Sequence, residues 1–289
     1  MTEKLDLAVI GGSGLYSMPG LTETVEHNLE TPFGKPSSPI IVGSLEGKKV
    51  AFLARHGLGH WITPTEVNYR ANLYALKMLG AQKIVSISAC GSLREDYAPG
   101  EIVIPDQLYD HTRGRREQTF FGEGLVAHVG AAEPFCPDLS RRVFAAVSAT
   151  GAAPHQGGTL ITIEGPRFST KAESNVYRSW GMSIIGMTAS PEAFLAREAE
   201  ICYATMAHVT DYDVWHVSAE PVTVEMVIKT LNQNTATAQA AIRHLVNNLD
   251  KEPDCACQRA LAEALITNPA VIPAATRQKL ALLVGKYLP

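Results

Sequence analysis

Short apolar runs recur along the chain, and each ends in glycine or in polar residues. They are too short and too rich in β-branched residues to be helices, so they predict buried strands. The expected strands are residues 7–10, 50–53, 84–87, 102–104, 159–163, 183–187 and 201–207. Apolar positions at helical spacing predict helices over residues 66–79, 138–149, 171–180, 191–198 and 222–249. Strands that alternate with helices indicate an α/β fold with a central mixed β-sheet surrounded by helices.

The chain of 289 residues is long enough to form one large α/β domain. We expect this domain to cover residues 1–249. The polar run over residues 250–254 resembles a linker, and short helical patterns follow over residues 260–266 and 274–288. Residues 250–289 are therefore expected to form a C-terminal helical extension that packs on the domain or on a neighbouring subunit. Residues 113–133 lack a clear period and predict a long functional loop.

Charge and hydropathy exclude several classes of protein. The net charge is -4, from 25 basic and 29 acidic residues, and no dense stripe of Lys and Arg is present. Nucleic acid is therefore not an expected partner. No apolar run reaches 18 residues and no signal peptide is apparent, so we expect no membrane partner and a cytoplasmic location.

The five cysteines are expected to be reduced thiols. Cys90, Cys136 and Cys202 lie in scattered contexts, whereas Cys255 and Cys257 form a Cys-Ala-Cys pair for which free thiols are favoured over a disulfide. No Cys-x-x-Cys spacing occurs, and no metal site is predicted.

Three strand ends carry small residues together with groups that bind anions. The first is Gly11-Gly12-Ser13-Gly14, where Ser17 occupies the place of the third glycine of a dinucleotide fingerprint. The second is Arg55-His56, and the third places the bare main chain of Ser88 and Ala89 after a buried strand. Each has an ordinary structural explanation when taken alone. Together they favour a cradle for inorganic phosphate.

Two acids, Asp211 and Asp213, follow the apolar run 201–207. Ligands of open α/β sheets bind at the carboxyl ends of strands. Because alternate residues of an extended chain point the same way, the pair can grip the N7 and amino edges of an aminopurine. Phe168 can stack on the base and Met187 can pack against the sugar, although both residue types are common in a plain core.

Beyond these arguments, the chain resembles the S-methyl-5'-thioadenosine phosphorylases of the purine nucleoside phosphorylase superfamily over roughly residues 6 to 249. The resemblance is carried by motifs that occur in order along the chain. They are Gly-Gly-Ser-Gly at 11–14, Thr-Pro-Phe-Gly-Lys-Pro-Ser at 31–37, Ala-Arg-His-Gly at 54–57, Val-Asn-Tyr-Arg-Ala-Asn at 67–72, Ala-Cys-Gly-Ser-Leu-Arg at 89–94, Ala-Glu-Pro-Phe-Cys at 132–136, Glu-Gly-Pro-Arg-Phe at 164–168 and Thr-Asp-Tyr-Asp at 210–213.

The resemblance implies a nucleoside phosphorylase-like fold and phosphorolysis of S-methyl-5'-thioadenosine to adenine and 5-methylthioribose-1-phosphate. It implies no cofactor, with phosphate as co-substrate, and a homo-oligomer that is a trimer or a hexamer. The implied phosphate ligands are Ser13, Arg55, His56, Ser88, Ala89 and Thr188. The implied nucleoside contacts are Phe168, Ser169, Met187, Asp211, Tyr212, Asp213, Val224 and Val227, with His128 reaching the pocket from a neighbouring subunit.

The chemistry is consistent with these residues. Cleavage of the glycosidic bond builds positive charge on the ribose and negative charge on the purine, so phosphate and an acid, Asp211, each face one developing charge. Three alternatives are weaker. A phosphorylase of 6-oxopurine nucleosides, such as methylthioinosine, inosine or guanosine, would favour Asn in place of Asp211. A nucleotide-linked dehydrogenase would need the third glycine of the dinucleotide fingerprint, which is absent. A nucleoside-binding protein without enzymatic activity would leave the phosphate-binding residues without a function.

Overall fold

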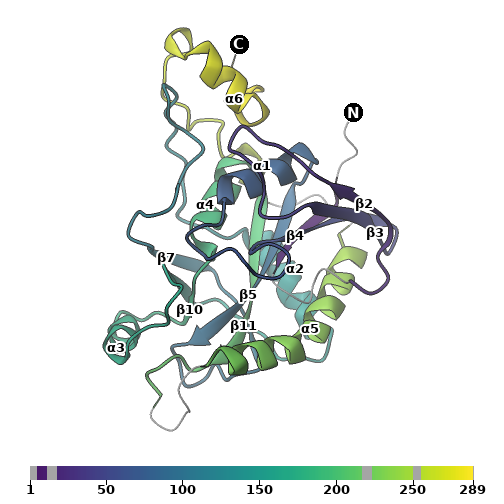
Figure 1. Cartoon of the computed structure of the whole chain (residues 1–289), viewed down its shortest axis with the longest axis vertical. Helices are drawn as coiled ribbons and strands as arrows, with labels where there is room; N and C mark the ends of the chain where they lie inside the picture. The colour runs from purple at the N-terminus through teal and green to yellow at the C-terminus, as the bar shows by residue number, and fades with distance from the viewer. Residues whose placement is uncertain (1–4, 12–17, 217–222, 250–254, 289) are drawn as a thin grey trace.

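The computed structural model describes residues 5–11, 18–216, 223–249 and 255–288 (Figure 1). A mixed sheet lies at its centre, in the order β2-β3-β4-β1-β5-β10-β9-β7, with β11 beside β5 and β6, and β8 beside β6. The strands are β1 (Leu7–Gly11), β2 (Thr22–His27), β3 (Ile40–Leu45), β4 (Lys48–Ala54), β5 (Lys83–Ser92), β6 (Ile102–Ile104), β7 (Gln107–His111), β8 (His155–Gln156), β9 (Thr159–Ile163), β10 (Ile184–Gly186) and β11 (Cys202–Asp211).

Strand β5 joins the two halves of the sheet. Its first part pairs in parallel with β1, nearly its whole length pairs in parallel with β11, and its last residues pair antiparallel with β10. Strand β11 is buried along its whole length. Because β5 and β11 run in parallel, their carboxyl ends open at the same edge of the sheet, and this edge carries the candidate site.

Helices cover both faces of the sheet. The α-helices are α1 (Tyr69–Met78), α2 (Pro137–Ser148), α3 (Lys171–Ser179), α4 (Ala189–Glu198), α5 (Val224–Asn247) and α6 (Ala274–Val284). Alternate residues of β1 enter different cores: Ala8 and Ile10 pack with α1 and α4, whereas Leu7 and Val9 pack with α2 and α5. Burial on both faces explains why this strand is a continuous apolar run.

The expected α/β fold is confirmed, and each of the seven expected strands and five expected helices is present within a few residues of its predicted bounds. Strands β2, β3, β7 and β8 were not predicted. Strand β2 is polar and almost fully exposed, so it has no apolar run to reveal it. The expected helix over residues 260–266 is wrong, because these residues form turns between the 3-10 helices η1 (Cys257–Arg259) and η2 (Pro269–Val271).

Residues 255–288 contact the remainder of the chain. Leu261, Leu280 and Leu283 are buried in the same core as α1 and α4. The backbone N–H of Leu261 donates to Glu200, and the Tyr74 hydroxyl donates to the carbonyl of Lys279. Figure 1 shows α6, in yellow, at one end of the long axis of the molecule. Among the described residues, no helix has the length and apolar character needed to cross a bilayer.

Candidate active site

A cavity of about 470 Å³ lies where β5, β9, β10 and β11 approach their carboxyl ends. It brings together most of the residues that the sequence singled out. The lining includes Arg55, His56, Ser88, Ala89, Phe168, Ser169, Met187, Thr188, Asp211, Asp213 and Val224. Its anion-binding groups come from the loop after β4, from β5 and from the start of α4, whereas its acids follow β11. The cavity therefore has two chemically different regions.

The guanidinium of Arg55 is buried and held by a network that the sequence did not reveal. Its Nε and Nη2 atoms donate to the two carboxylate oxygens of Glu192 at 2.8 and 2.9 Å. Nη2 also donates to Ser86 at 2.6 Å, and Nη1 donates to the carbonyl of Ile87 at 3.3 Å. These bonds use four of the five N–H groups of the guanidinium. Within the described chain, one N–H of Nη1 is left for a ligand.

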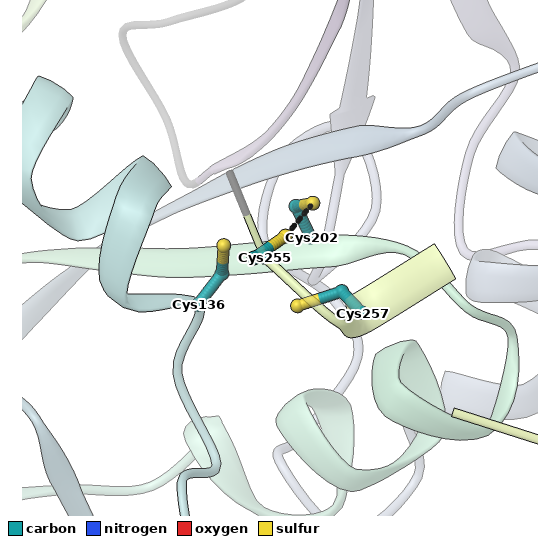
Figure 2. Close-up of side chains that lie close together, drawn as sticks. All are labelled: Cys136, Cys202, Cys255 and Cys257. Atoms are coloured by element: carbon teal, nitrogen blue, oxygen red, sulfur yellow. Dashed lines mark hydrogen bonds between the residues drawn. The ribbon is translucent and has the colours of Figure 1, made fainter. Parts of the chain in front are cut away.

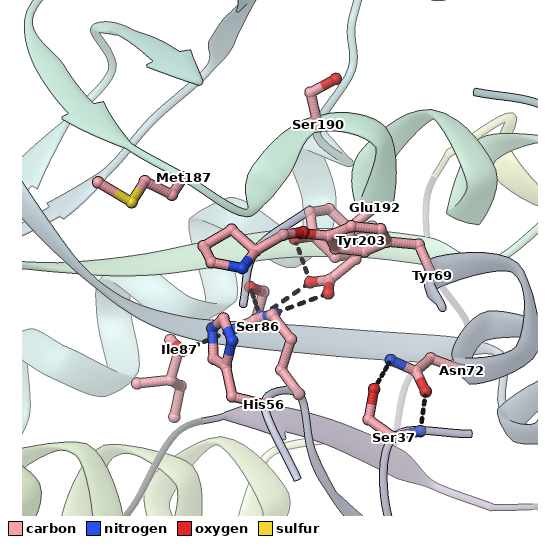
Figure 3. A network of polar contacts seen from close by, with 12 residues as sticks. Ser37, His56, Tyr69, Asn72, Ser86, Ile87, Met187, Ser190, Glu192 and Tyr203 are labelled. Carbon is pink, nitrogen blue, oxygen red and sulfur yellow. Dashed lines mark hydrogen bonds and ion pairs between the residues drawn. The ribbon is translucent and has the colours of Figure 1, made fainter. Parts of the chain in front are cut away.

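Glu192 lies on α4 and is itself fully buried. The hydroxyl of Tyr203 on β11 donates to it at 2.8 Å, so the carboxylate joins α4, β11 and the loop after β4 (Figure 3). Burial alone would lower the pKa of Arg55, but the Glu192 carboxylate offsets this effect and raises the pKa above its usual value. The guanidinium therefore stays charged and fixed in direction.

His56 lies beside Arg55 and faces the same cavity. Its Nδ1 lies 2.9 Å from the carbonyl of Ile62, so the neutral ring carries its proton on Nδ1 and leaves Nε2 as an acceptor. Burial and then the charge of Arg55 lower its pKa to about 4. The ring stacks on His60, with centroids 4.4 Å apart. An anion bound next to His56 would favour the protonated ring, which donates from both nitrogens.

The segment at the start of α4 adds a hydroxyl donor for an anion. Thr188 is the N-cap residue, yet its hydroxyl makes no capping hydrogen bond and faces the cavity. The backbone is not helical at Ser190, and the Ser190 N–H donates to the Thr162 hydroxyl, so the hydroxyl of Thr188 is the donor that this segment offers. Ser88 and Ala89 line the cavity from β5. This region has the donors and the charge that a phosphate requires.

Asp211 and Asp213 line the same cavity, but not for the expected reason. Strand β11 ends at Asp211, and Asp213 has a positive φ of 50°. The backbone N–H of Asp213 donates to Oδ1 of Asp211 at 2.7 Å, so a tight turn rather than an extended chain brings the two carboxyl groups together. Gly91 allows this approach, because a Cβ there would lie 2.9 Å from Oδ1 of Asp211.

Both carboxyl groups are buried, and burial raises the pKa of each. For Asp211 the neighbouring Asp213 adds to the rise, while hydrogen bonds from the Thr210 hydroxyl and from the Asp213 backbone oppose it. A carboxyl group of this kind holds a proton closer to neutral pH than a surface aspartate does. The hydroxyls of Ser174 and Ser169 oppose the rise in the pKa of Asp213, but its Oδ2 is buried and accepts no direct hydrogen bond among the residues described, so it can accept from a ligand.

Some expected contacts are not in this cavity. Tyr212 stacks on His216, with centroids 4.6 Å apart, and is not part of the lining. His128 is exposed, and its backbone N–H donates to Ala264 in the C-terminal segment. Ser13 lies outside the described residues, as does the side chain of Val227 on α5. Ile228, which was not predicted, lines the cavity beside Val224.

Arg116 is a second buried cation that sequence reasoning missed. It extends from the irregular loop 113–133 and donates to the carbonyls of Met187 and Ser190, each at 2.7 Å, and to that of Glu164 at 2.9 Å. These bonds fix the wall of the cavity around Met187. A single Arg in a segment without periodicity carries no signal that distinguishes it from a solvated side chain.

His208, on β11, was also missed. It lines the cavity and is 1% exposed, and neither ring nitrogen has a hydrogen-bond partner in the described chain. Burial lowers its pKa to about 4. Its position within an apolar strand concealed it, because the run 201–207 that predicted the strand ends just before it.

Comparisons with known proteins place the chain in a family. The sequence profile of the Phosphorylase superfamily matches residues 6–247. The chain belongs to the phosphorylase superfamily. It is 56% identical over 281 residues to the S-methyl-5'-thioadenosine phosphorylase of Chloroflexus aurantiacus, with 97% of this chain and 98% of that protein covered. It is 53% identical over 282 residues to the enzyme of that name from Koribacter versatilis, covering 98% and 96%.

Solved structures of this superfamily share the fold. A methylthioadenosine phosphorylase sourced from an antarctic soil metagenomic library has a TM-score of 0.92 and 48% identity, with 97% of this chain and 99% of that chain covered. The methylthioadenosine phosphorylase of Schistosoma mansoni in complex with adenine has a TM-score of 0.83 and 34% identity, with 98% of each chain covered. The nucleoside phosphorylase-like architecture expected from the sequence is thereby confirmed.

Proposed function

We propose that this protein is a pentosyltransferase that cleaves S-methyl-5'-thioadenosine with phosphate, giving adenine and 5-methylthioribose-1-phosphate. The observation that carries the proposal is the division of one cavity into two regions. Arg55, His56 and Thr188 lie in the first region, and Asp211 and Asp213 lie in the second. The relatives named for this activity match over nearly their whole length. The reaction recovers purine and the methylthio sugar for salvage.

The purine region accounts for the choice of an amino base. Asp211, whose pKa is raised by burial, is the proton donor to N7 of the purine. The free Oδ2 of Asp213 accepts from the 6-amino group. As the bond from C1' to N9 breaks, its electron pair stays on the purine, and the proton from Asp211 neutralises the negative charge that develops there. A 6-oxo base offers an acceptor in place of the amino donor and leaves Oδ2 unpaired.

The phosphate region supplies the nucleophile. A phosphate oxygen forms the new bond to C1' while the cationic guanidinium of Arg55 fixes the anion in place. Phosphate also stabilises the positive charge that builds on the ribose ring. Neutral His56 accepts a hydrogen bond from a protonated phosphate oxygen through Nε2, or donates one when it is protonated itself. We propose that no organic cofactor takes part, since phosphate and the acid pair supply the chemistry.

The region next to α5 suits an apolar 5' substituent. Val224 and Ile228 both line the cavity, and both are more than half exposed in a single chain. A methylthio group packs well against aliphatic side chains. Exposure of these side chains also suggests that another surface covers them. We infer that a neighbouring copy of this chain closes the pocket through the loop that bears His128, in a trimeric or hexameric assembly.

The test is release of free adenine from S-methyl-5'-thioadenosine, measured with and without phosphate. We expect phosphate-dependent release and a stoichiometric amount of 5-methylthioribose-1-phosphate. Methylthioinosine, inosine and guanosine serve as controls for the 6-oxo preference, and we expect turnover on them to be lower. Release that does not depend on phosphate would identify a hydrolase instead. Faster turnover of methylthioinosine would identify the 6-oxopurine phosphorylase.

A further inference from the structure

Four cysteines that are far apart in the sequence meet at one point. Cys136 is the N-cap residue of α2, Cys202 is the first residue of β11, and Cys255 and Cys257 belong to the C-terminal segment. Their four sulfur atoms all lie within 4.8 Å of one another (Figure 2). The expectation that Cys136 and Cys202 occupy unrelated contexts is therefore wrong. The topology joins them because the chain before α2 runs beside β11, where the Cys136 N–H donates to the carbonyl of Tyr203.

The arrangement matches a tetrahedral metal site. Zinc binds thiolates at about 2.3 Å, so a tetrahedron of four sulfurs around it has edges of about 3.8 Å. The sulfurs of Cys202 and Cys255 are 3.4 Å apart, and all of the other pairs lie within the 4.8 Å limit. A disulfide brings two sulfurs together in a pair, whereas here every sulfur is close to all three others. All four thiols are free in this structure.

The surroundings of the sulfurs suit thiolates. The backbone N–H of Leu139 points at Cys136 Sγ at 3.5 Å, and the guanidinium of Arg197 donates to Cys257 Sγ at 3.4 Å. Donors of this kind orient and stabilise metal ligands. A zinc ion with four thiolates has a net charge of -2, which the Arg197 cation and the positive N-terminus of α2 partly balance. Cys136, Cys202 and Cys257 are buried, and Cys255 is partly exposed.

We propose that Cys136, Cys202, Cys255 and Cys257 bind one zinc ion in a closed structural site. Each thiol releases its proton when its sulfur binds the metal, and no oxidant or reductant is needed. The site is distant from the cavity, because Cys202 and Asp211 lie at opposite ends of β11, a ten-residue strand about 30 Å long. A site with four protein ligands leaves no position for substrate. Its role is to fasten the C-terminal segment to α2 and to the central sheet.

The full chain is purified under reducing, anaerobic conditions without chelator, and its metal content is measured by inductively coupled plasma mass spectrometry. We expect one zinc per chain. Replacement by Co²⁺ should give the visible absorption bands of a tetrahedral tetrathiolate site. Removal of zinc should lower the melting temperature by roughly 5 °C or more, because a ligand that binds only the folded state stabilises it.

Variants identify the ligands. Cys257→Ser and, at the partly exposed position, Cys255→Ser should each lose most of the zinc, whereas Cys90→Ser, at a buried cysteine outside the cluster, should retain it. Two variants are used so that one misfolded protein does not decide the result. The zinc content of the unaltered chain tests the proposal independently of both variants. Reduced, folded protein without zinc would overturn the proposal. So would recovery of the four cysteines as disulfides in protein that was never exposed to oxidant.

Discussion

Asp211 combines two requirements that conflict at a protein surface: it must hold a proton near neutral pH and it must keep a fixed direction. Burial raises the pKa of Asp211 and so favours the first, and the bonds to Thr210 and to the Asp213 backbone supply the second. We therefore expect Asp211→Asn to lower turnover of S-methyl-5'-thioadenosine by on the order of a hundredfold or more, since the amide keeps the size but not the acid. Relative activity on methylthioinosine should rise.

Steady-state kinetics on both nucleosides measures this effect, with Asp96→Asn as the matched control. Asp96 is an exposed acid paired with Arg94, outside the cavity lining. The control should keep wild-type turnover and selectivity. Unaltered kinetics in Asp211→Asn would show that another group protonates the purine.

A second residue, His208, sets part of the pH dependence of stability. Its pKa is about 4 in the folded chain and about 6.5 when unfolded. Between these pH values the unfolded chain binds a proton that the native ring does not. The stability that the neutral ring allows is therefore fully present above pH 6.5, and it is lost as the pH falls towards 4. The loss amounts to at most about 3 kcal/mol on this scale.

We expect His208→Leu to remove this contribution. Denaturant unfolding of both proteins between pH 8 and pH 4.5 gives the free energy of unfolding at each pH. The difference between variant and wild type should shift in favour of the variant as the pH falls. Other titrating groups, His56 among them, are common to both proteins and cancel in the difference. Parallel curves would show that the ring is already protonated or partnered.

At the scale of elements, Arg55 joins the loop after β4 to α4 through Glu192. Because Arg55 is also a proposed phosphate ligand, a single substitution changes both stability and phosphate binding. Arg55→Ala removes a contact to phosphate, for which a charge-assisted bond contributes roughly 1.5 to 3 kcal/mol. It also leaves the Glu192 carboxylate buried and unpaired, which costs about 3 to 5 kcal/mol of stability. We expect a higher Michaelis constant for phosphate and a lower melting temperature together.

The double variant Arg55→Ala with Glu192→Ala separates these effects. It removes the unpaired carboxylate, so part of the lost stability should return while the Michaelis constant for phosphate stays high. Phosphate titration at saturating nucleoside and thermal unfolding provide the two measurements. Recovery of both quantities in the double variant would mean that Arg55 acts only on folding.

The elements also show what the sequence can predict. Strands buried on both faces, such as β11, are continuous apolar runs, and the strand ends that carry Arg55, Ser88 and Asp211 could be found from such runs alone. Residues that become partners only through the tertiary fold could not be found in this way. Glu192 is an acid within a helix, which in a sequence resembles any solvated position. Its burial is matched by the ion pair with Arg55, which is 137 residues away in the chain and cannot be paired with it from the sequence.

The same limit applies to the cysteines. Cys255 and Cys257 are near neighbours in the sequence, but Cys136 and Cys202 join them only through the path of the chain before α2. Zinc motifs are recognised from pairs with short spacing, and this site has one Cys-x-Cys pair with two distant ligands. Tertiary structure was required to assemble it.

At the scale of the whole molecule, the wall of the cavity formed by α5 is exposed in one chain. Val224 is 63% exposed although it lines the cavity, and His128 is exposed on a loop that packs against the C-terminal segment. We expect the active species to be a homo-oligomer in which His128 of one copy covers the 5' group bound by another. His128→Ala should therefore raise the Michaelis constant for the nucleoside and leave that for phosphate nearly unchanged.

Mixed oligomers test whether the site is shared. When Asp211→Asn chains and His128→Ala chains are mixed, unfolded and refolded together, some sites combine an intact Asp211 from one copy with an intact His128 from the next. Such sites should combine wild-type turnover with a low Michaelis constant for the nucleoside, a combination that neither parent protein has. Each parent refolded alone is the control, and light scattering gives the subunit number. If His128 acts within its own chain, no mixed site gains a complete set, and the mixture will show only the average of its parents.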